Sequence, residues 1–276
     1  MPFFTQTQID KIISFVFEAG EIALNFQKSR DFTITRKPDN TEVTSADIAV
    51  SKFLDQKLSQ EFPQIPIVCE EGNLREFASE IFWLIDPIDG TSSFIKGSDE
   101  FAISVALIKN HQPAFGVLYA PRFEGGKMAF SNANDQVSIV DRNNNTKLLQ
   151  NISLQQPQGL APLKVVTSKK TKDSEILNYL NQFHSDYVNN FSVKHLASAV
   201  KFFAILEKNA DLYISFRKMM EWDTAAGHAL VDISGGKLKN LTLQNSLYVI
   251  GDDLKYKKPN FTNDFFACYQ TYLQIK

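Results

Sequence analysis

Two aspartates, Asp86 and Asp89, stand three residues apart after a short apolar segment, a spacing typical of a metal or phosphate site. The apolar segment at residues 81–85 is typical of a buried strand. Pro87 has no backbone N–H, so we expect it to end the pairing of that strand and to turn the chain. Gly90 then allows a backbone geometry that leaves the following N–H groups uncovered. Oxygen ligands and phosphate-binding amides are therefore predicted side by side.

Further carboxylates occupy comparable positions elsewhere in the chain. Glu70 and Glu71 follow a predicted strand at residues 67–69, and Asp223 stands at the start of a predicted Ala-rich helix. Glu71 is not expected to be a ligand, because neighbouring residues at a strand end point in opposite directions. The four acidic residues that the pattern selects are Glu70, Asp86, Asp89 and Asp223. They have no Cys or His partner nearby, which favours Mg²⁺ over Zn²⁺, and if they converge, cations must offset their repulsion.

An ordinary acidic turn is the simplest alternative for an isolated Asp-Pro-x-Asp-Gly, since short acidic motifs recur by chance. The accompanying Glu70 and Asp223 motifs make a shared site the better interpretation.

Apolar spacing predicts two helices ahead of these carboxylates. Apolar side chains recur every three or four residues through residues 5–27, which indicates an amphipathic helix. Thr44 or Ser45 is expected to cap a second helix that runs through Phe62. Asp47 would lie in the first turn of this second helix.

The remaining pattern changes along the chain. Apolar runs at 101–110 and 113–121, joined by His111 and Gln112, predict a hairpin. The polar stretch from Asp141 to Gly159 is the expected boundary. After it, strands near 163–168, 188–193 and 211–216 alternate with helices near 174–183 and 198–209. We predict an α/β (α+β) fold, a single domain over 1–276 with an α+β half at about 1–155 and an α/β half at about 156–276.

Composition excludes several classes of protein. The 276 residues are 43% hydrophobic, enough for a large core. A net charge of -2 gives no electrostatic reason to expect a nucleic acid polymer as partner. Cys69 and Cys268 are too few for a disulfide framework and lack zinc-binding neighbours. No apolar stretch approaches the length of a transmembrane segment. We therefore expect a cytoplasmic protein that acts on small molecules.

Four separated motifs resemble the inositol monophosphatase superfamily of lithium-sensitive, magnesium-dependent phosphatases. They are EVTSAD at 42–47, CEEG at 69–72, DPIDGTSSF at 86–94 and WDTAAG at 222–227. Each motif is weak alone, but together they occur in the order of the superfamily and cover most of the chain. The resemblance implies a layered αβαβα sugar-phosphatase fold of two joined halves, with the active site between them.

The resemblance also implies two to three Mg²⁺ ions. One would be held by Glu70, Asp86 and the backbone carbonyl of Ile88, and a second by Asp86, Asp89 and Asp223. A third, weaker ion would lie near Glu70. In such a site one ion activates a water molecule while the other stabilises the leaving oxygen.

Catalytic and substrate-binding roles are implied in the same way. Thr91, paired with Asp47, would accept a proton from the attacking water, and Glu70 belongs to the same catalytic set. The N–H groups of Gly90 and Thr91, at the start of a helix, would hold phosphate oxygens. The expected substrate contacts are Asp89, Gly90, Thr91, Ser92 and Asp223, with Ser168, Lys169, Lys170, Lys201 and His228 as further candidates.

Longer phrases resemble the 3'(2'),5'-bisphosphate nucleotidase branch of the superfamily. They are KPDNTEVTSAD at 37–47, SAVKFFAILEKNADLY at 198–213 and EWDTAAGHALV at 221–231. This branch removes the 3'-phosphate of adenosine 3',5'-bisphosphate, a by-product of sulfate activation. The chain departs from the branch at Ser92 and Ser93 and at residues 167–170 and 214–216, where the nucleotide is expected to bind. Lys169 and Lys170 either form a solvated pair or meet the second phosphate.

Three interpretations remain open. The resemblance favours a bisphosphate nucleotidase, with a small-molecule phosphomonoester as substrate and a monomer or homodimer as the assembly. The first alternative is an inositol monophosphatase or another sugar or polyol phosphatase. The second is a catalytically silent phosphate-binding regulator, but every proposed site position holds a competent residue, which argues against it.

Overall fold

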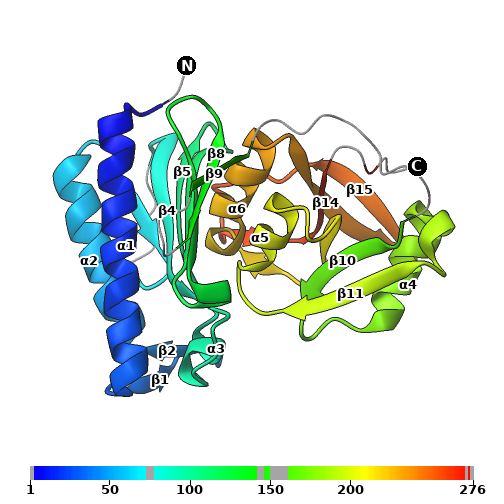
Figure 1. Cartoon of the computed structure of the whole chain (residues 1–276), viewed down its shortest axis with the longest axis horizontal. Coiled ribbons are helices and arrows are strands. Elements are labelled where there is room, and N and C mark those ends of the chain that lie inside the picture. Colours follow the sequence, from blue (N-terminus) through cyan, green and yellow to red (C-terminus); the bar gives the residue numbers. More distant parts are fainter. Residues whose placement is uncertain (1–2, 73–77, 142–145, 150–160, 271–272, 274–276) are drawn as a thin grey trace.

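The computed structural model describes residues 3–72, 78–141, 146–149, 161–270 and 273. Five layers follow one another across the molecule in the order helices, sheet, helices, sheet, helix (Figure 1). The helices are α1 (Gln6–Ser29), α2 (Ser45–Glu61), α3 (Thr91–Ile95), α4 (Asp173–Phe183), α5 (Lys201–Leu206) and α6 (Trp222–Ile233), with 3₁₀ turns at Phe123–Gly125 and Ser185–Tyr187. The predicted layered αβαβα arrangement is confirmed.

Two large sheets are built from separate stretches of the chain. The first has the strand order β3-β4-β5-β6-β7-β8-β9 and the second β11-β10-β12-β17-β14-β15. The strands of the first are β3 (Ile67–Cys69), β4 (Ile81–Asp89), β5 (Ala102–Lys109), β6 (Gln112–Ala120), β7 (Lys127–Ser131), β8 (Val137–Asp141) and β9 (Thr146–Leu149). Those of the second are β10 (Leu163–Ser168), β11 (Phe191–Leu196), β12 (Leu212–Ser215), β14 (Gly236–Gln244), β15 (Leu247–Asp253) and β17 (Phe265–Gln270). Two small pairs complete the set, β1 (Ile34–Arg36) with β2 (Glu42–Thr44) and β13 (Met219–Met220) with β16 (Thr262–Asn263).

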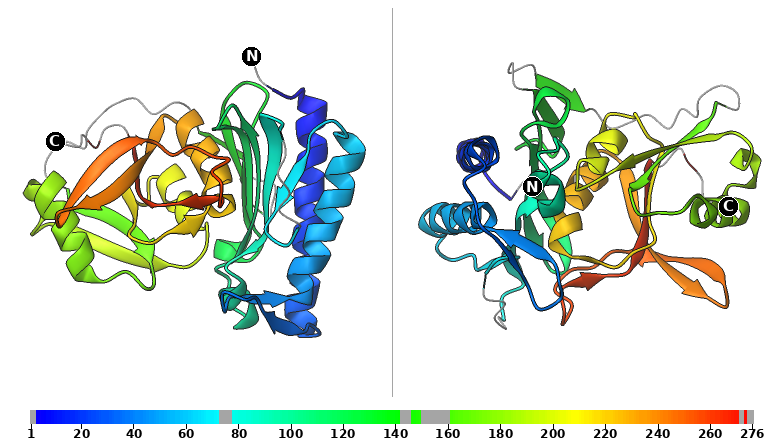
Figure 2. Two further views of the ribbon diagram at one scale, coloured as in Figure 1. Left: turned by 180° about the vertical axis from the view of Figure 1, so that it is seen from behind. Right: turned by 90° about the horizontal axis from the view of Figure 1, so that it is seen from below.

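Three hydrophobic cores hold the layers together. One joins α1 and α2 to the outer face of the first sheet, and another joins α4 to the far face of the second sheet. The central core contains residues of both sheets and of α5 and α6, which lie between them (Figure 2). At Gly116 of β6 an added Cβ would lie 2.6 Å from the backbone oxygen of Ala226, so α6 approaches the sheet more closely than a side chain would allow.

The predicted helices near the N-terminus are confirmed, and their caps explain where they begin. The hydroxyl of Thr5 accepts a hydrogen bond from the N–H of Gln8, and the side chain of Gln8 returns a bond to the cap. Thr44 and Asp47 make the same reciprocal arrangement at the start of α2. The capping hydrogen bonds of α2 therefore hold the side chain of Asp47 in position independently of its contacts with the rest of the site.

A one-residue bulge in β4 sets the directions of the two aspartates. Asp86 pairs with Ser104 and Asp89 with Ala102, so three steps along β4 match two steps along β5. Side chains alternate between faces along a regular strand, and the extra residue restores both aspartates to one face. This is the face toward α6, because the Ser104 hydroxyl donates to the backbone oxygen of Trp222 at 3.1 Å.

Several sequence-based predictions of element ends need correction. Pro87 does not end the strand, because the bulge accommodates a residue without an N–H and β4 continues to Asp89. Gln112 belongs to β6, and the hairpin turn is formed by Asn110 and His111, both with positive φ. In the second half the strand near 188–193 begins at Phe191, and the helix near 198–209 is confined to Lys201–Leu206.

The predicted boundary at residues 141–159 falls mostly on residues 142–145 and 150–160, which lie outside the described residues. Its described part is the end of β8 and the strand β9, which both belong to the first sheet. The division into halves at about residue 155 stays a prediction.

Candidate active site

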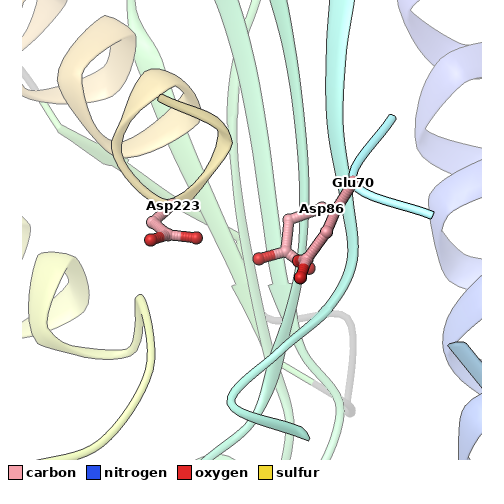
Figure 3. Close-up of side chains that lie close together, drawn as sticks. All are labelled: Glu70, Asp86 and Asp223. Carbon is pink, nitrogen blue, oxygen red and sulfur yellow. The ribbon is translucent and has the colours of Figure 1, made fainter. Parts of the chain in front are cut away.

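Three carboxylates from three elements converge between the two halves. Glu70 follows β3, Asp86 lies on β4 and Asp223 lies in the first turn of α6. Each offers one oxygen, and these oxygens lie within 4.8 Å of one another. Figure 3 shows the side chain of Asp223 directed from α6 toward Glu70 and Asp86 on the first sheet. Residues that are 153 positions apart in sequence thus form one acidic cluster.

Burial and mutual repulsion destabilise the charged forms of these carboxylates. Asp86 is 1% exposed, and burial, followed by the charges of Glu70, Asp89 and Asp223, raises its pKa well above the ordinary value. Burial and the charges of Asp89 and Glu70 likewise raise the pKa of Asp223. Its position is set by the N–H of Met220, which donates to Asp223 Oδ2 at 2.9 Å.

Asp89 lies beside the cluster and has a partner in the second half. Its Oδ2 accepts a hydrogen bond from the N–H of Ala199, in the segment that leads into α5. Burial raises the pKa of Asp89, whereas the charge of Lys201 and the Ala199 bond oppose that rise. Within the described part of the chain, Asp89 is therefore held by the second half and is not grouped with Glu70, Asp86 and Asp223.

Thr91 and Asp47 are brought together, as the resemblance implied. Thr91 Oγ1 lies 3.1 Å from Asp47 Oδ1 and 3.2 Å from the backbone oxygen of Ile88, two acceptors for its single proton. Asp47 is 1% exposed, and burial raises its pKa although bonds from Thr44 and Thr91 lower it. The pair is therefore a hydroxyl beside a buried carboxylate that is predisposed to take up a proton.

The turn at Gly90 requires glycine. Its φ is +88°, and an added Cβ would lie 2.9 Å from Ser198 Cβ and 3.1 Å from the backbone oxygen of Glu100. Gly90 precedes the short helix α3, so the second half packs directly against the start of that helix.

A cleft of about 480 Å³ lies next to the carboxylate cluster, and most of the residues that line it belong to residues 168–223. Asp89 and Asp223 line it, and so do four of the five further candidates that the sequence suggested, together with two other cationic residues. These cleft residues are Ser168, Lys169, Lys170, Lys201, Arg217 and Lys218. An acidic cluster next to a cationic wall suits a substrate that carries more than one anionic group.

Residues 5–264 match the inositol monophosphatase family. The chain belongs to this family. The family predicted from the four motifs is thus confirmed, and the matched residues include every carboxylate of the cluster.

Curated relatives of this inositol monophosphatase family member are named CysQ 3'(2'),5'-bisphosphate nucleotidase. The protein of Buchnera aphidicola is 32% identical over 259 residues, which are 92% of each chain. That of Aggregatibacter actinomycetemcomitans is 31% identical over 273 residues, which are 96% of this chain and 97% of the relative. The predicted resemblance to the bisphosphate nucleotidase branch is confirmed.

Solved structures share the fold of this family member. The crystal structure of CysQ from Bacteroides thetaiotaomicron superposes with a TM-score of 0.76 at 23% identity, over 97% of this chain and 98% of that chain. In the described residues no helix is both long and apolar enough to cross a membrane.

Members of the inositol monophosphatase family use divalent metal ions, and the donor set of this chain fits such an ion. Glu70, Asp86 and Asp223 offer hard oxygen atoms from three elements within 4.8 Å of one another. Burial and repulsion raise the pKa values of Asp86 and Asp223, so a cation between them would relieve an unfavourable arrangement.

Some expected substrate contacts lie away from the cleft. His228 is 0% exposed and does not line the cleft in the described structure; its Nδ1 lies 2.9 Å from the hydroxyl of Tyr256, and its Nε2 lies 3.2 Å from Asp232 Oδ2. His228 therefore has no contact with the cleft in the described structure, and its approach to the substrate stays a prediction. Ser92 is exposed on α3, and neither it nor Gly90 and Thr91 line the described cleft.

Lys201 lines the cleft, although its side chain is almost fully buried. It is 3% exposed, and its ammonium group donates to the backbone oxygens of Ser198 and, at 3.5 Å, Leu196. Burial lowers the pKa of Lys201 to about 8, although the charges of Asp89 and Asp223 act in the opposite direction. Lys201 thus places an amino group that two backbone oxygens hold in position next to two site carboxylates.

Sequence reasoning did not identify two charged residues of the site. Lys37, beyond β1, donates to Glu70 Oε1 and Glu71 Oε1 at 2.7 Å each. Glu100 accepts the N–H of Ala197 at 2.6 Å and pairs with Lys169 at 2.8 Å. Lys37 and Glu100 lie within or close to the sequence segments that resemble the family. Their partners are distant in sequence, so no spacing pattern indicates the contacts.

Proposed function

We propose that this protein is a Mg²⁺-dependent phosphomonoester hydrolase that removes the 3'-phosphate of adenosine 3',5'-bisphosphate. The convergence of Glu70, Asp86 and Asp223 within 4.8 Å carries the proposal, because it supplies the oxygen donors that such hydrolysis needs. The bisphosphate nucleotidases of Buchnera aphidicola and Aggregatibacter actinomycetemcomitans, at 32% and 31% identity, support the choice of substrate.

Two to three Mg²⁺ ions would be held by Glu70, Asp86, Asp89, Asp223 and the backbone oxygen of Ile88. When bound, Mg²⁺ lowers the pKa of water and offsets charge on phosphoryl oxygens. In the described structure the Ile88 oxygen faces Thr91 Oγ1 at 3.2 Å, so it is free for another partner when Thr91 donates to Asp47.

Thr91 and Asp47 would handle the proton of the attacking water. When the Thr91 hydroxyl donates to Asp47 Oδ1, its oxygen lone pairs can accept a proton from a water molecule. The pKa of Asp47 is raised by burial, which suits it to take the proton that Thr91 passes on. Glu70 would complete this set by orienting the same water.

The cationic wall of the cleft would bind the second phosphate. Lys170 and Lys218 line it, and the side chain of Arg217 is turned toward Lys170, donating to the backbone oxygen of that residue at 2.9 Å. Ser168, Lys169 and Lys201 would contribute from the same wall, while Gly90, Thr91 and Ser92 would meet the phosphate that is removed. The substrate would be a small cytoplasmic molecule, and the enzyme a monomer or homodimer.

Phosphate release by the purified protein tests the proposal. Adenosine 3',5'-bisphosphate, adenosine 5'-monophosphate and inositol 1-phosphate are compared at equal concentrations with Mg²⁺, with EDTA and with Li⁺. We expect the bisphosphate to be the best substrate, adenosine 5'-monophosphate to be the product, and EDTA to abolish turnover. Asp223→Asn should be inactive, whereas Asp55→Asn, a change on the exposed face of α2, should be active.

Other results would redirect the assignment. Preferred hydrolysis of inositol 1-phosphate would indicate an inositol or polyol phosphatase and would reject the nucleotide substrate. Binding of Mg²⁺ and nucleotide without phosphate release would indicate a phosphate-binding regulator.

A further inference from the structure

A buried polar network surrounds the start of α6, next to residues that line the cleft. Thr224, which follows Asp223 in sequence, and Asn263 of β16 are each 0% exposed. Asn263 Nδ2 donates to Thr224 Oγ1 at 2.8 Å, and Asn263 Oδ1 accepts a hydrogen bond from Lys258 Nζ. Thr224 Oγ1 donates in turn to the backbone oxygen of Glu221 at 3.1 Å. Fully satisfied polar groups in such a place restrict the backbone to one arrangement.

The same network is also connected to the carboxylate of Asp223. β16 pairs with β13 through Met219–Asn263 and Met220–Thr262. The N–H of Met220 then donates to Asp223 Oδ2 at 2.9 Å. Hydrogen bonds therefore connect Thr224 of α6 to Asn263 of β16, β16 to β13, and β13 to Asp223. Asp223 carries the carboxylate that faces Glu70 and Asp86.

Glu221 anchors the chain segment that leads into β16. It is 0% exposed, and its carboxylate accepts the N–H groups of Lys257 at 2.7 Å and Lys258 at 3.0 Å, besides Lys258 Nζ at 3.1 Å. The N–H of Glu221 donates to the backbone oxygen of Phe261 at 2.7 Å. β13 and β16 have two residues each, so their own pairing contributes little, and the side chains of Glu221 and Asn263 must locate them.

We propose that Asn263 and Thr224 are positioning residues that hold the carboxylate of Asp223 in the orientation required to bind a divalent cation. Neither residue lines the described cleft, so neither is expected to touch substrate. Groups that orient a metal ligand through hydrogen bonds determine metal affinity, and here they act through the Met220 N–H. The inference rests on the proposed function in requiring that a cation binds at the acidic cluster.

Thr224→Val is the direct test, because valine keeps the shape of threonine and removes the acceptor for Asn263 Nδ2. Binding of Mn²⁺ to the metal-free protein is measured by electron paramagnetic resonance, without substrate, and Tm is measured for each variant. We expect Thr224→Val to weaken Mn²⁺ binding about ten-fold. Thr224→Ser, which keeps the hydroxyl, should bind Mn²⁺ within about two-fold of the wild type.

Ser234→Ala is the matched control. The Ser234 hydroxyl is also 0% exposed and bonded within α6, to the backbone oxygen of Val231 at 2.9 Å, but it lies at the other end of the helix. It should lower Tm without changing Mn²⁺ affinity. Thr224→Ala, which leaves room beside Asn263, replaces the valine variant should that variant not fold.

Two outcomes would overturn the inference, and they differ in what else they reject. If the wild type binds Mn²⁺ and the valine or alanine variant binds it equally well at a reduced Tm, then Thr224 and Asn263 are structural only and the proposed function stands. If the wild type binds no Mn²⁺, the metal site of the proposed function fails together with this inference.

Discussion

Asp86→Asn is expected to stabilise the metal-free protein although it removes a central site residue. Asp86 is 1% exposed, and burial and the charges of Glu70, Asp89 and Asp223 raise its pKa. Asparagine keeps the Oδ1 acceptor for the N–H of Ile88, which donates to Asp86 Oδ1 at 3.1 Å, and removes the charge. The local hydrogen bond therefore stays while the repulsion disappears.

The size of the effect follows from the separation of the carboxylates. Their oxygens lie within 4.8 Å of one another, and two unit charges at that distance repel by about 3.5 kcal/mol at an effective dielectric constant of about 20. Uptake of a proton relieves part of this repulsion in the wild type, at about 1.4 kcal/mol for each unit of pKa. We therefore expect the free energy of unfolding to rise by about 2 kcal/mol, which corresponds to about 4–8 °C in Tm for a chain of this length.

Thermal unfolding in EDTA and in excess Mg²⁺ measures both sides of this argument. In EDTA the Asp86→Asn variant should have the higher Tm. Mg²⁺ should raise the Tm of the wild type, by about 2.7 kcal/mol of stability at a concentration a hundred-fold above the dissociation constant, and should change the variant little. Asp55→Asn, at an exposed position of α2, should behave as the wild type in both conditions. A lower Tm for Asp86→Asn in EDTA, or an equal Mg²⁺ shift in both proteins, would refute the reasoning.

Three further predictions concern pH, the nucleophile and the second phosphate. The pKa values of Asp86, Asp89 and Asp223 are raised from 3.8, so the folded metal-free protein binds more protons than the unfolded chain. Its stability should therefore fall as pH rises from 3.8 through the raised pKa values. The Tm measured in EDTA should decrease across this range, and a flat profile would contradict the raised pKa values. Thr91→Val should lower kcat about 10²–10⁴-fold with little change in Tm, whereas Thr91→Ser should retain activity, and equal rates for both would exclude Thr91 from proton transfer. Lys170→Ala should raise KM for adenosine 3',5'-bisphosphate about ten-fold and leave inositol 1-phosphate hydrolysis unchanged, and an equal effect on both substrates would place the second phosphate elsewhere.

Periodicity was sufficient to predict the first helices, the family resemblance implied the layers, and the positions of acidic residues indicated most of the carboxylate cluster. The helices at Gln6–Ser29 and Ser45–Glu61 have clear apolar spacing and self-contained caps, so their sequences alone indicate them. Glu70, Asp86 and Asp223 could be selected because acidic residues at element ends are unusual together. Their separation within 4.8 Å could not be derived, since it depends on how α6 packs against the first sheet.

Other features depend on partners that are distant in sequence. The continuation of β4 past Pro87 requires β5 as a partner strand, and the pairing of Lys37 with Glu70 and Glu71 requires the β1–β2 hairpin to lie over the site. The orientation of His228 could have been predicted from the sequence, because His228 follows Asp223 by five residues, and five residues along a helix correspond to a rotation of about 140°. The two side chains therefore point to nearly opposite sides of α6, and only one of them can face the cleft.

The bulge in β4 makes the site sensitive to the length of the chain as well as to its composition. Asp86 and Asp89 share a face only because one extra residue lies between them relative to Ser104 and Ala102 of β5. An in-frame insertion of one codon between Ala102 and Ser104 would retain every acidic residue of the site, yet it would let β5 match β4 residue for residue, and regular alternation would then send one of the two aspartates into the apolar layer beneath α1 and α2. A single-residue insertion here should therefore be tolerated less than a substitution of Ile103, and an insertion scan of residues 101–105 would reveal this as a sharp minimum in function.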